Sequence, residues 1–280
     1  PRSTLDRSSA ASDVYKRQNE YMIFGSGAAQ EMHRRWFESH LGKFDVKYKN
    51  RSDEFHGLAI SGPKSREVLQ KVVREEVSNK SFKFRDSKKM YVAGVPAIVN
   101  RISFTGELGY EIYVAPHYQL KLYEELTDSG KEFNIKPFGL RALMSMRLEK
   151  NWGAWTLDYR PDFTAKETGL DTFINWDKEF IGKKFAKDDN SKNKLTPMIV
   201  ETNEIDVTYN EAVLKNDKAI GYITSGGFAH FVNKSIAFSY LDTNELNSGK
   251  GIQVEINGDL FNCSIIKEPL YDPSGQKMRS

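Results

Sequence analysis

The chain has 280 residues, of which 39% are apolar and 28% are charged, a composition typical of a folded globular protein and too apolar for a disordered one. Its single cysteine, Cys263, excludes a disulfide framework and a cysteine-based zinc site, and so low a count fits a reducing compartment. No apolar run approaches the roughly 20 residues of a membrane helix, which excludes a protein that crosses a membrane as helices.

The first 18 residues differ from the rest of the chain. Residues 1–18 show no hydrophobic periodicity, and the run 13–18 (DVYKRQ) resembles the translated read-through of a sequencing adaptor. We therefore expect a non-native or disordered leader at 1–18 and a natural protein that begins upstream of it. Without the leader, the 41 basic and 38 acidic residues fall to 37 and 36, and the net charge falls from +3 to +1. So small a charge favours neither nucleic acid nor a membrane surface as a partner.

Residues 19–150 mix strand and helix patterns. Apolar residues with strand-like spacing predict strands at 21–24, 58–60, 91–95, 97–104 and 110–114. Apolar residues with helical spacing predict helices at about 28–41, 63–73, 116–130 and 140–150. At least one pair of these strands follows directly in sequence and is expected to be antiparallel. The pattern therefore predicts an α+β domain and not a regular doubly wound sheet.

The second part of the chain is almost entirely β. A polar run at 187–194 (KDDNSKNK) contains no apolar residue and predicts a domain boundary. Short strands are expected beyond it, at 198–201, 219–224, 235–241, 252–256 and 260–266. The Asn257–Gly258 pair predicts a tight hairpin between the last two. Short strands without intervening helices predict a small barrel or sandwich.

The segment 103–112 (SFTGELGYEI) is the first candidate for a functional site. After two glycines three residues apart, Tyr110 and Ile112 share one face of a strand and Glu111 lies on the other. An unpaired carboxylate in the middle of an apolar strand is costly to bury. Two interpretations stay open: Glu111 faces solvent, or it faces a ligand and accepts paired N–H bonds from an amidine-like ring.

A second candidate is the helix that ends near residue 150, together with the residues that follow it. Arg147 shares a helix face with Leu143. The two tryptophans that follow, Trp152 and Trp155, either stack on a flat ligand or fill a core. The five histidines lack the spacing of metal ligands, so no metal site is expected. Spacing alone thus predicts an α+β domain and a small β domain, and no particular chemistry.

A family resemblance adds chemistry to these patterns. The run 104–111 (FTGELGYE) resembles the signature of the aminomethyltransferase, or glycine cleavage T-protein (GcvT), family, whose members bind tetrahydrofolate. Further matching stretches follow in the family's order, at 58–65 (LAISGPKS), 146–150 (MRLEK), 179–185 (EFIGKKF), 221–227 (GYITSGG) and 269–273 (PLYDP). The resemblance implies a ferredoxin-like, aminomethyltransferase folate-binding domain at 19–188, incomplete at its N-terminus, and a small C-terminal β-barrel domain at 194–275.

The stretches 148–155, 159–165 and 167–171 are more similar to the folate-binding C-terminal half of dimethylglycine and sarcosine dehydrogenases. This resemblance implies a tetrahydrofolate-binding module that accepts a methylene unit from an N-methyl amine and yields 5,10-methylenetetrahydrofolate. FAD would then act only through a missing N-terminal domain, a fused partner. A stand-alone glycine-cleavage aminomethyltransferase, served by a lipoyl carrier protein, is one alternative, and a non-catalytic folate-binding protein is another. A cytoplasmic location, or the mitochondrial matrix in a eukaryote, is expected.

The resemblance also implies roles for particular residues. Glu111 would recognise the pterin ring, and Phe104 would lie against it, where many T-proteins have tyrosine. Tyr110, Arg147 and Trp155 would complete the cofactor pocket.

The resemblance does not identify a catalytic residue in this chain. The family's catalytic aspartate precedes the segment that matches 21–30, so it is expected upstream of Asn19, within the expected leader. Asp13 lies in that leader, and the family role is not transferred to it. We therefore assign no catalytic residue, expect the family aspartate to be absent from this chain, and expect the chain to be inactive in that case.

Overall fold

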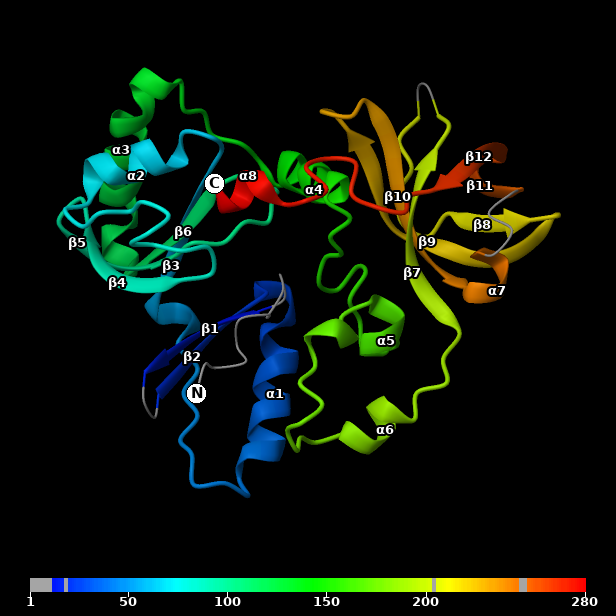
Figure 1. Ribbon diagram of the computed structural model, residues 1–280, viewed down its shortest axis with the longest axis horizontal. Coiled ribbons are helices and arrows are strands. Elements are labelled where there is room, and N and C mark those ends of the chain that lie inside the picture. Colours follow the sequence, from blue (N-terminus) through cyan, green and yellow to red (C-terminus); the bar gives the residue numbers. More distant parts are fainter. Residues whose placement is uncertain (1–11, 18–19, 203–204, 247–250) are drawn as a thin grey trace. The chain divides into compact units, whose positions relative to one another are not determined.

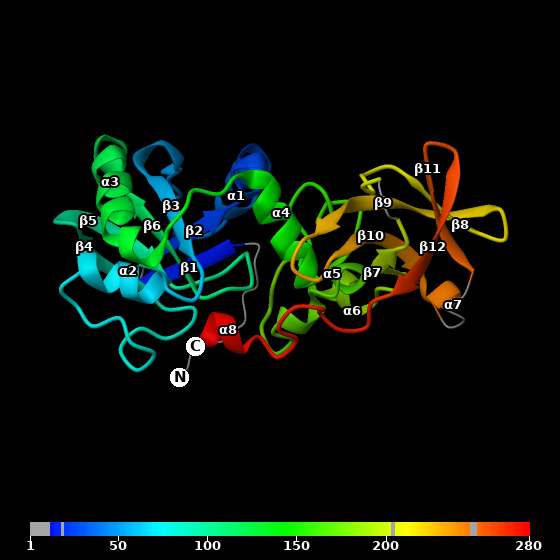
Figure 2. The ribbon, with the colours of Figure 1, turned by 90° about the horizontal axis from the view of Figure 1, so that it is seen from above.

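The computed structural model describes residues 12–17, 20–202, 205–246 and 251–280, and Figures 1 and 2 show its elements. The chain divides into two compact units. Gln30–Leu143 and Ser274–Ser280 form one, here named the sheet unit, and Pro1–Ala29 and Met144–Pro273 form the other, here named the barrel unit. None of the described helices is long and apolar enough to cross a membrane.

A four-stranded antiparallel sheet with the strand order β3-β6-β5-β4 forms the centre of the sheet unit. The strands are β3 (His56–Ser61), β4 (Ser87–Val92), β5 (Val95–Asn100) and β6 (Gly109–Val114). The helices are α1 (Gln30–Leu41), α2 (Ser65–Val72), α3 (Gln119–Gly130) and α8 (Gln276–Arg279). Short 3-10 turns occur at η3 (Ser52–Glu54), η4 (Pro116–Tyr118) and η5 (Lys131–Phe133).

The core of the sheet unit lies between the sheet and the helices α2 and α3 (Figure 1). Leu69 of α2 and Leu122 of α3 are fully buried and pack in one cluster with Ile112 and Val114 of β6. Successive side chains of a strand point to opposite faces, so Glu111 and Tyr113, on either side of Ile112, point away from this core. Strand β6 therefore presents Glu111 on the face that does not carry this cluster.

The barrel unit contains a closed six-stranded antiparallel barrel with the order β10-β7-β12-β11-β8-β9. The strands are β7 (Asn193–Val200), β8 (Ala212–Lys215), β9 (Lys218–Ala229), β10 (Lys234–Asp242), β11 (Ile252–Ile256) and β12 (Asp259–Ile265). The shorter elements are η2 (Gly27–Ala29), α5 (Ala165–Thr168), η6 (Asp171–Phe173), α6 (Lys183–Lys187) and α7 (Thr243–Leu246). Helix α4 (Leu140–Glu149) contributes residues to both units.

The barrel agrees closely with the strand pattern of the sequence. Met198, Val213 and Val254 are fully buried in its interior. Asn257 and Gly258 have φ angles of 53° and 92°, which a tight hairpin turn between β11 and β12 requires. The predicted α+β class and the C-terminal barrel are confirmed, and the sandwich alternative is wrong.

Two segments differ from the expected organisation. Ser12–Arg17, within the expected leader at 1–18, forms strand β1 and pairs antiparallel with β2 (Glu20–Gly25), so these six residues have regular structure. Residues 144–188 make their contacts within the barrel unit, although the sequence pattern groups them with the first domain. Buried charges at the end of α4 explain this second difference.

The boundary between the expected leader and the first domain falls at Asn19. Asn19 itself lies outside the described residues, as do residues 1–11 and 18 of the leader. The pairing of β1 with β2 crosses this boundary, because Arg17 and Glu20 are register partners on either side of it. Ser12–Arg17 therefore pairs across the predicted boundary, and the leader at 1–18 as a whole stays a prediction. The expectation that the family's catalytic aspartate lies upstream of Asn19 and is absent stays a prediction.

Candidate functional site

Glu111 lies on β6 and is half-buried, with its side chain on the sheet face that does not carry the α2–α3 core. The hydroxyl of Tyr113, two residues along the same face, donates a hydrogen bond to Glu111 Oε2 at 2.5 Å. Burial raises the pKa of the Glu111 carboxyl, and the Tyr113 hydrogen bond only partly opposes this shift. The carboxyl group is therefore not in bulk solvent, which agrees with the ligand-facing interpretation.

Asn100 is the neighbour of Glu111 on the adjacent strand. The two residues are register partners in the β5–β6 pair, so their side chains share one face and lie next to each other. Asn100 is 1% exposed, and its Oδ1 accepts a hydrogen bond from Ser87 Oγ at 2.6 Å. Within the described residues its Nδ2 is buried and has no hydrogen-bond partner. This face thus carries a carboxylate acceptor beside an unused amide donor.

The loop that precedes β6 is fixed by the turn that begins α2. Ser65 Oγ donates to the carbonyl oxygen of Leu108 at 3.0 Å, and Gly62 N donates to the same oxygen at 2.8 Å. Ser61 Oγ is 2.5 Å from Thr105 Oγ1. The two sequence motifs at 58–65 and 104–111 therefore hold each other in place.

The two aromatic residues of this segment have different positions. Phe104 is half-buried in the loop between β5 and β6. Tyr110 is 1% exposed, and its ring lies 5.7 Å from that of Phe82 inside the α2–α3 core. Tyr110 and Glu111 therefore point to opposite faces of β6, and the assignment of Tyr110 to the cofactor pocket stays a prediction that this position does not support. The alternation of side chains along 110–114 already placed Tyr110 on the apolar face, with Ile112 and Val114.

Glu111 is expected to make the sheet unit less stable as the pH rises through the raised pKa of its carboxyl group. Since its pKa in the fold is above the ordinary value of 4.5, the unfolded chain ionises first, and the fold loses stability as the pH rises from about 4.5 through the raised pKa. Glu111→Gln cannot ionise and is expected to gain stability relative to the wild type over that interval. Urea unfolding of both chains at a series of pH values measures the difference. A wild type that gains stability over the variant with rising pH would contradict this account.

Arg147, in the barrel unit, is held by a buried ion pair. Its Nη1 is 2.8 Å from Asp158 Oδ2 and also donates to the carbonyl oxygen of Trp152 at 2.9 Å. Arg147 and Asp158 are 1% and 0% exposed, respectively. Burial lowers the pKa of Arg147, and the charge of Asp158 opposes that shift. Arg147 therefore has a structural role in the barrel unit, and its expected pocket role stays a prediction.

Asp158 is the residue that sequence patterns missed. Its Oδ1 accepts hydrogen bonds from Thr224 Oγ1 at 2.5 Å and Ser225 Oγ at 2.7 Å, both on β9. Its Oδ2 accepts a further bond from Ala154 N at 2.8 Å, and its carbonyl oxygen accepts one from Tyr240 at 2.7 Å. The GYITSGG motif at 221–227 contains the two β9 hydroxyls, and this is the one signal that could have pointed to Asp158.

The other charges of the MRLEK motif are buried as well. Glu149 Oε1 accepts from Phe231 N at 2.8 Å, and Lys150 Nζ donates to the carbonyl oxygen of Asp272 at 2.5 Å. This motif, one of the stretches that resemble the family, thus anchors the end of α4 to the barrel.

The expected site residues are divided between the two units. Glu111 and Phe104 belong to the sheet unit, whereas Arg147 and Trp155 belong to the barrel unit. Trp155 is half-buried and meets the ring of Tyr159 edge to face at 6.2 Å. A role of these residues in folate binding stays a prediction.

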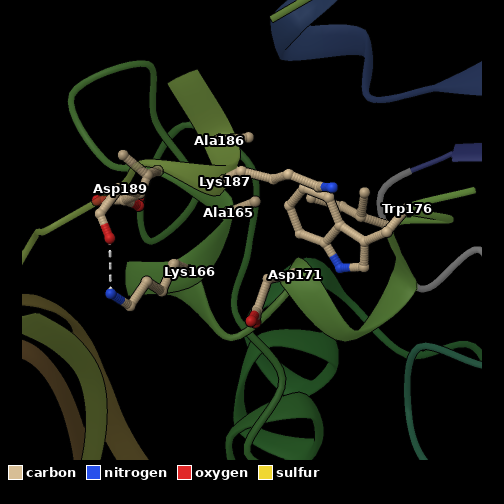
Figure 3. Close-up of a pocket in the computed structure, with 9 residues that line it drawn as sticks. Ala165, Lys166, Asp171, Trp176, Ala186, Lys187 and Asp189 are labelled. Carbon is tan, nitrogen blue, oxygen red and sulfur yellow. Dashed lines mark hydrogen bonds between the residues drawn. The ribbon is translucent and has the colours of Figure 1, made fainter. Parts of the chain in front are cut away.

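A cavity of about 380 Å³ lies within residues 164–189 of the barrel unit, and Figure 3 shows its lining. Four charged side chains and one tryptophan contribute to it, namely Lys166, Asp171, Trp176, Lys187 and Asp189. These residues come from short helices and loops without periodicity, so the sequence did not predict the cavity. The described residues contain no group of three or more His, Cys, Asp or Glu side chains that could hold a metal ion.

Two family models match the chain. Residues 14–178 match the GCVT N-terminal domain, and residues 194–272 match the glycine cleavage T-protein C-terminal barrel domain. The solved structure of the glycine cleavage system aminomethyltransferase T from Bartonella henselae has a TM-score of 0.77, covering 90% of this chain and 69% of that one. Its sequence identity is 20%, so this match concerns the fold.

Curated relatives fall into two groups. The mitochondrial dimethylglycine dehydrogenase of Homo sapiens is 37% identical over 257 residues, which cover 89% of this chain and 29% of that protein. The aminomethyltransferase of Caldanaerobacter subterraneus subsp. tengcongensis is 34% identical over 270 residues, which cover 94% of this chain and 71% of that protein. The chain therefore spans less than a third of the first relative and about seven tenths of the second.

Proposed function

Because the chain belongs to the glycine cleavage T-protein family, whose members are enzymes of one-carbon transfer, we propose that it binds tetrahydrofolate on the β6 face that carries Glu111. The half-buried carboxyl of Glu111 is the observation that carries the proposal. When bound, tetrahydrofolate supplies the amine nitrogens N5 and N10 that accept the one-carbon unit.

The polar groups of this face fit the edge of a pterin ring. A pterin presents adjacent N–H donors and one carbonyl acceptor along a single edge. Glu111 offers carboxylate oxygens for the donors, and Asn100 Nδ2 is a buried donor without a partner in the described part of the chain. Charge-assisted bonds of this kind are the stronger ones in proteins, so Glu111 would hold the ring in one orientation. Phe104, in the preceding loop of the same unit, would lie against the ring.

The dimethylglycine dehydrogenase relatives favour one form of this function. Their identity of 37% exceeds the 34% of the aminomethyltransferase named above, which supports a module that captures the methylene unit of an N-methyl amine as 5,10-methylenetetrahydrofolate. Flavin chemistry on the amine would then belong to sequence outside this chain. The alternative is an aminomethyltransferase that receives its one-carbon unit from a lipoyl carrier protein.

Calorimetric titration with tetrahydrofolate under reducing, oxygen-free conditions tests the folate site. Glu111→Gln is expected to weaken binding by about ten- to a hundred-fold, because one charged hydrogen-bond group contributes roughly 1.5–3 kcal/mol. Glu111→Ala is expected to abolish measurable binding. Glu125→Gln is the matched control, since Glu125 is exposed on α3 of the same unit. Unchanged affinity in both Glu111 variants would remove this residue from the site.

A second assay separates the two forms of the function. A lipoyl carrier protein loaded with an aminomethyl group releases ammonia when an aminomethyltransferase passes its carbon to tetrahydrofolate. The dehydrogenase-type module is expected to bind tetrahydrofolate without accelerating this release. Release well above the uncatalysed rate would favour the aminomethyltransferase alternative.

A further inference from the structure

Two of the charged side chains that line the cavity at 164–189, Asp189 and Lys166, form hydrogen bonds within the protein. Asp189 Oδ1 accepts hydrogen bonds from Ser191 Oγ at 2.5 Å and Ser191 N at 2.8 Å. The side chains of Ser191 and Thr164 lower the pKa of Asp189 to about 2, so this carboxylate is ionised and paired. Lys166 Nζ donates to the carbonyl oxygen of Asp189 at 2.8 Å, as the dashed line in Figure 3 shows. These groups form a fixed polar wall.

Two other charged side chains that line the cavity form no hydrogen bond or ion pair with the described residues. Neither the Lys187 ammonium nor the Asp171 carboxylate has a hydrogen bond or an ion pair to any described residue, and no ion pair joins them to each other. Glu179, an acidic neighbour of this segment, is bound to Lys183 at 2.6 Å. Lys183 is the main cause that lowers the pKa of Glu179, and Lys187 contributes least to that shift. The cavity therefore offers one free positive and one free negative group.

An apolar surface accompanies these two charges. Trp176 is half-buried and lines the cavity with Ile174, Ala165 and Ala186. In Figure 3 the Lys187 side chain extends towards the Trp176 indole ring. A flat aromatic wall next to charged groups suits a ligand with an apolar body, and an indole ring also attracts a substituted ammonium group.

These features select one class of ligand. A ligand that carries only a negative charge would leave Asp171 without a partner. A ligand that carries only a positive charge would leave Lys187 without a partner and would be repelled by Lys166 and Lys187. A neutral apolar molecule would leave both free charges unpaired. We propose that this cavity binds a free α-amino acid, N-methylated or not, as a zwitterion: Lys187 binds its carboxylate, Asp171 binds its ammonium group, and its side chain packs on Trp176. A volume of about 380 Å³ is sufficient for such a ligand. All the residues involved belong to the barrel unit, so the site does not rest on folate binding by Glu111.

Saturation-transfer NMR on the full chain tests this proposal with the standard L-amino acids, sarcosine and N,N-dimethylglycine as probes. At least one of them is expected to bind with a dissociation constant below about 10 mM. Calorimetry then compares the strongest of these probes with its deaminated and decarboxylated analogues. Each analogue lacks one charge and is expected to bind at least about ten-fold more weakly.

Single substitutions locate the site. Asp171→Asn and Lys187→Met are each expected to weaken binding of that probe by about ten-fold or more. Asp177→Asn and Lys184→Met are the matched controls, since both residues are exposed in the same segment and neither lines the cavity. Far-UV circular dichroism and thermal unfolding of all four variants separate lost binding from lost folding. Tetrahydrofolate titration of the same variants is expected to give the wild-type result.

Three outcomes would overturn the proposal. One is the absence of saturable binding by every probe up to about 10 mM. Another is equal binding of the probe and its one-charge analogues, and the third is binding that survives both Asp171→Asn and Lys187→Met.

Discussion

Replacing Asp158 by alanine is expected to lower the free energy of unfolding of the barrel unit by about 3–5 kcal/mol, the usual cost of breaking a buried ion pair on one side. The change removes the acceptor for Arg147, which is 1% exposed and would keep a buried charge without its counter-ion. It also leaves the hydroxyls of Thr224 and Ser225 and the N–H of Ala154 without their acceptor. Unsatisfied buried donors add to the loss.

Hydrogen exchange measured by mass spectrometry checks this result, because it reports each unit separately. Peptides of β9 and β10 are expected to lose protection in Asp158→Ala, whereas peptides of β5 and β6 in the sheet unit keep it. Asp162→Ala is the control: Asp162 is 61% exposed and pairs with Arg160 at the surface, so its removal is expected to cost less than about 1 kcal/mol. A loss in Asp158→Ala no larger than in this control would show that the ion pair does not stabilise the barrel.

The sequence predicted the features that depend on neighbours in the chain. The hairpin at Asn257–Gly258 needs only two residues that tolerate a positive φ angle, and both residues have one in the structure. The faces of β6 follow from alternation, which placed Tyr110 and Glu111 on opposite sides before any contact was known. These features are local, and a pattern of a few residues is enough to predict them.

The role of Arg147 depends on residues far away in sequence. Asp158 lies 11 residues from Arg147 and 66 from Thr224, and no periodic pattern connects the three. A charged residue on an apolar helix face therefore looks the same in the sequence whether it binds a ligand or a buried counter-ion. The cavity at 164–189 escaped notice for a similar reason, because its walls come from loops and helices of four or five residues.

Replacing Phe82 by alanine is expected to have a comparably large effect on the sheet unit, about 3–5 kcal/mol for a fully buried aromatic side chain. Phe82 is 0% exposed and packs against Tyr110 in the core, on the opposite side of β6 from Glu111. Lys88 Nζ lies 5.0 Å from the centre of its ring. The truncation therefore leaves a void beneath the strand that carries the proposed folate carboxylate.

The expected exchange pattern in Phe82→Ala is the reverse of that for Asp158→Ala. Peptides of β5 and β6 lose protection and those of the barrel keep it, since each unit has its own core. Phe44→Ala is the control, because Phe44 is 57% exposed in the same unit and its truncation is expected to change stability by less than about 0.5 kcal/mol. Tetrahydrofolate affinity should fall in Phe82→Ala in proportion to the unfolded fraction of the sheet unit and recover at lower temperature. Equal loss of protection in both units would mean that they unfold together, and the separate cores would then not be separate units of stability.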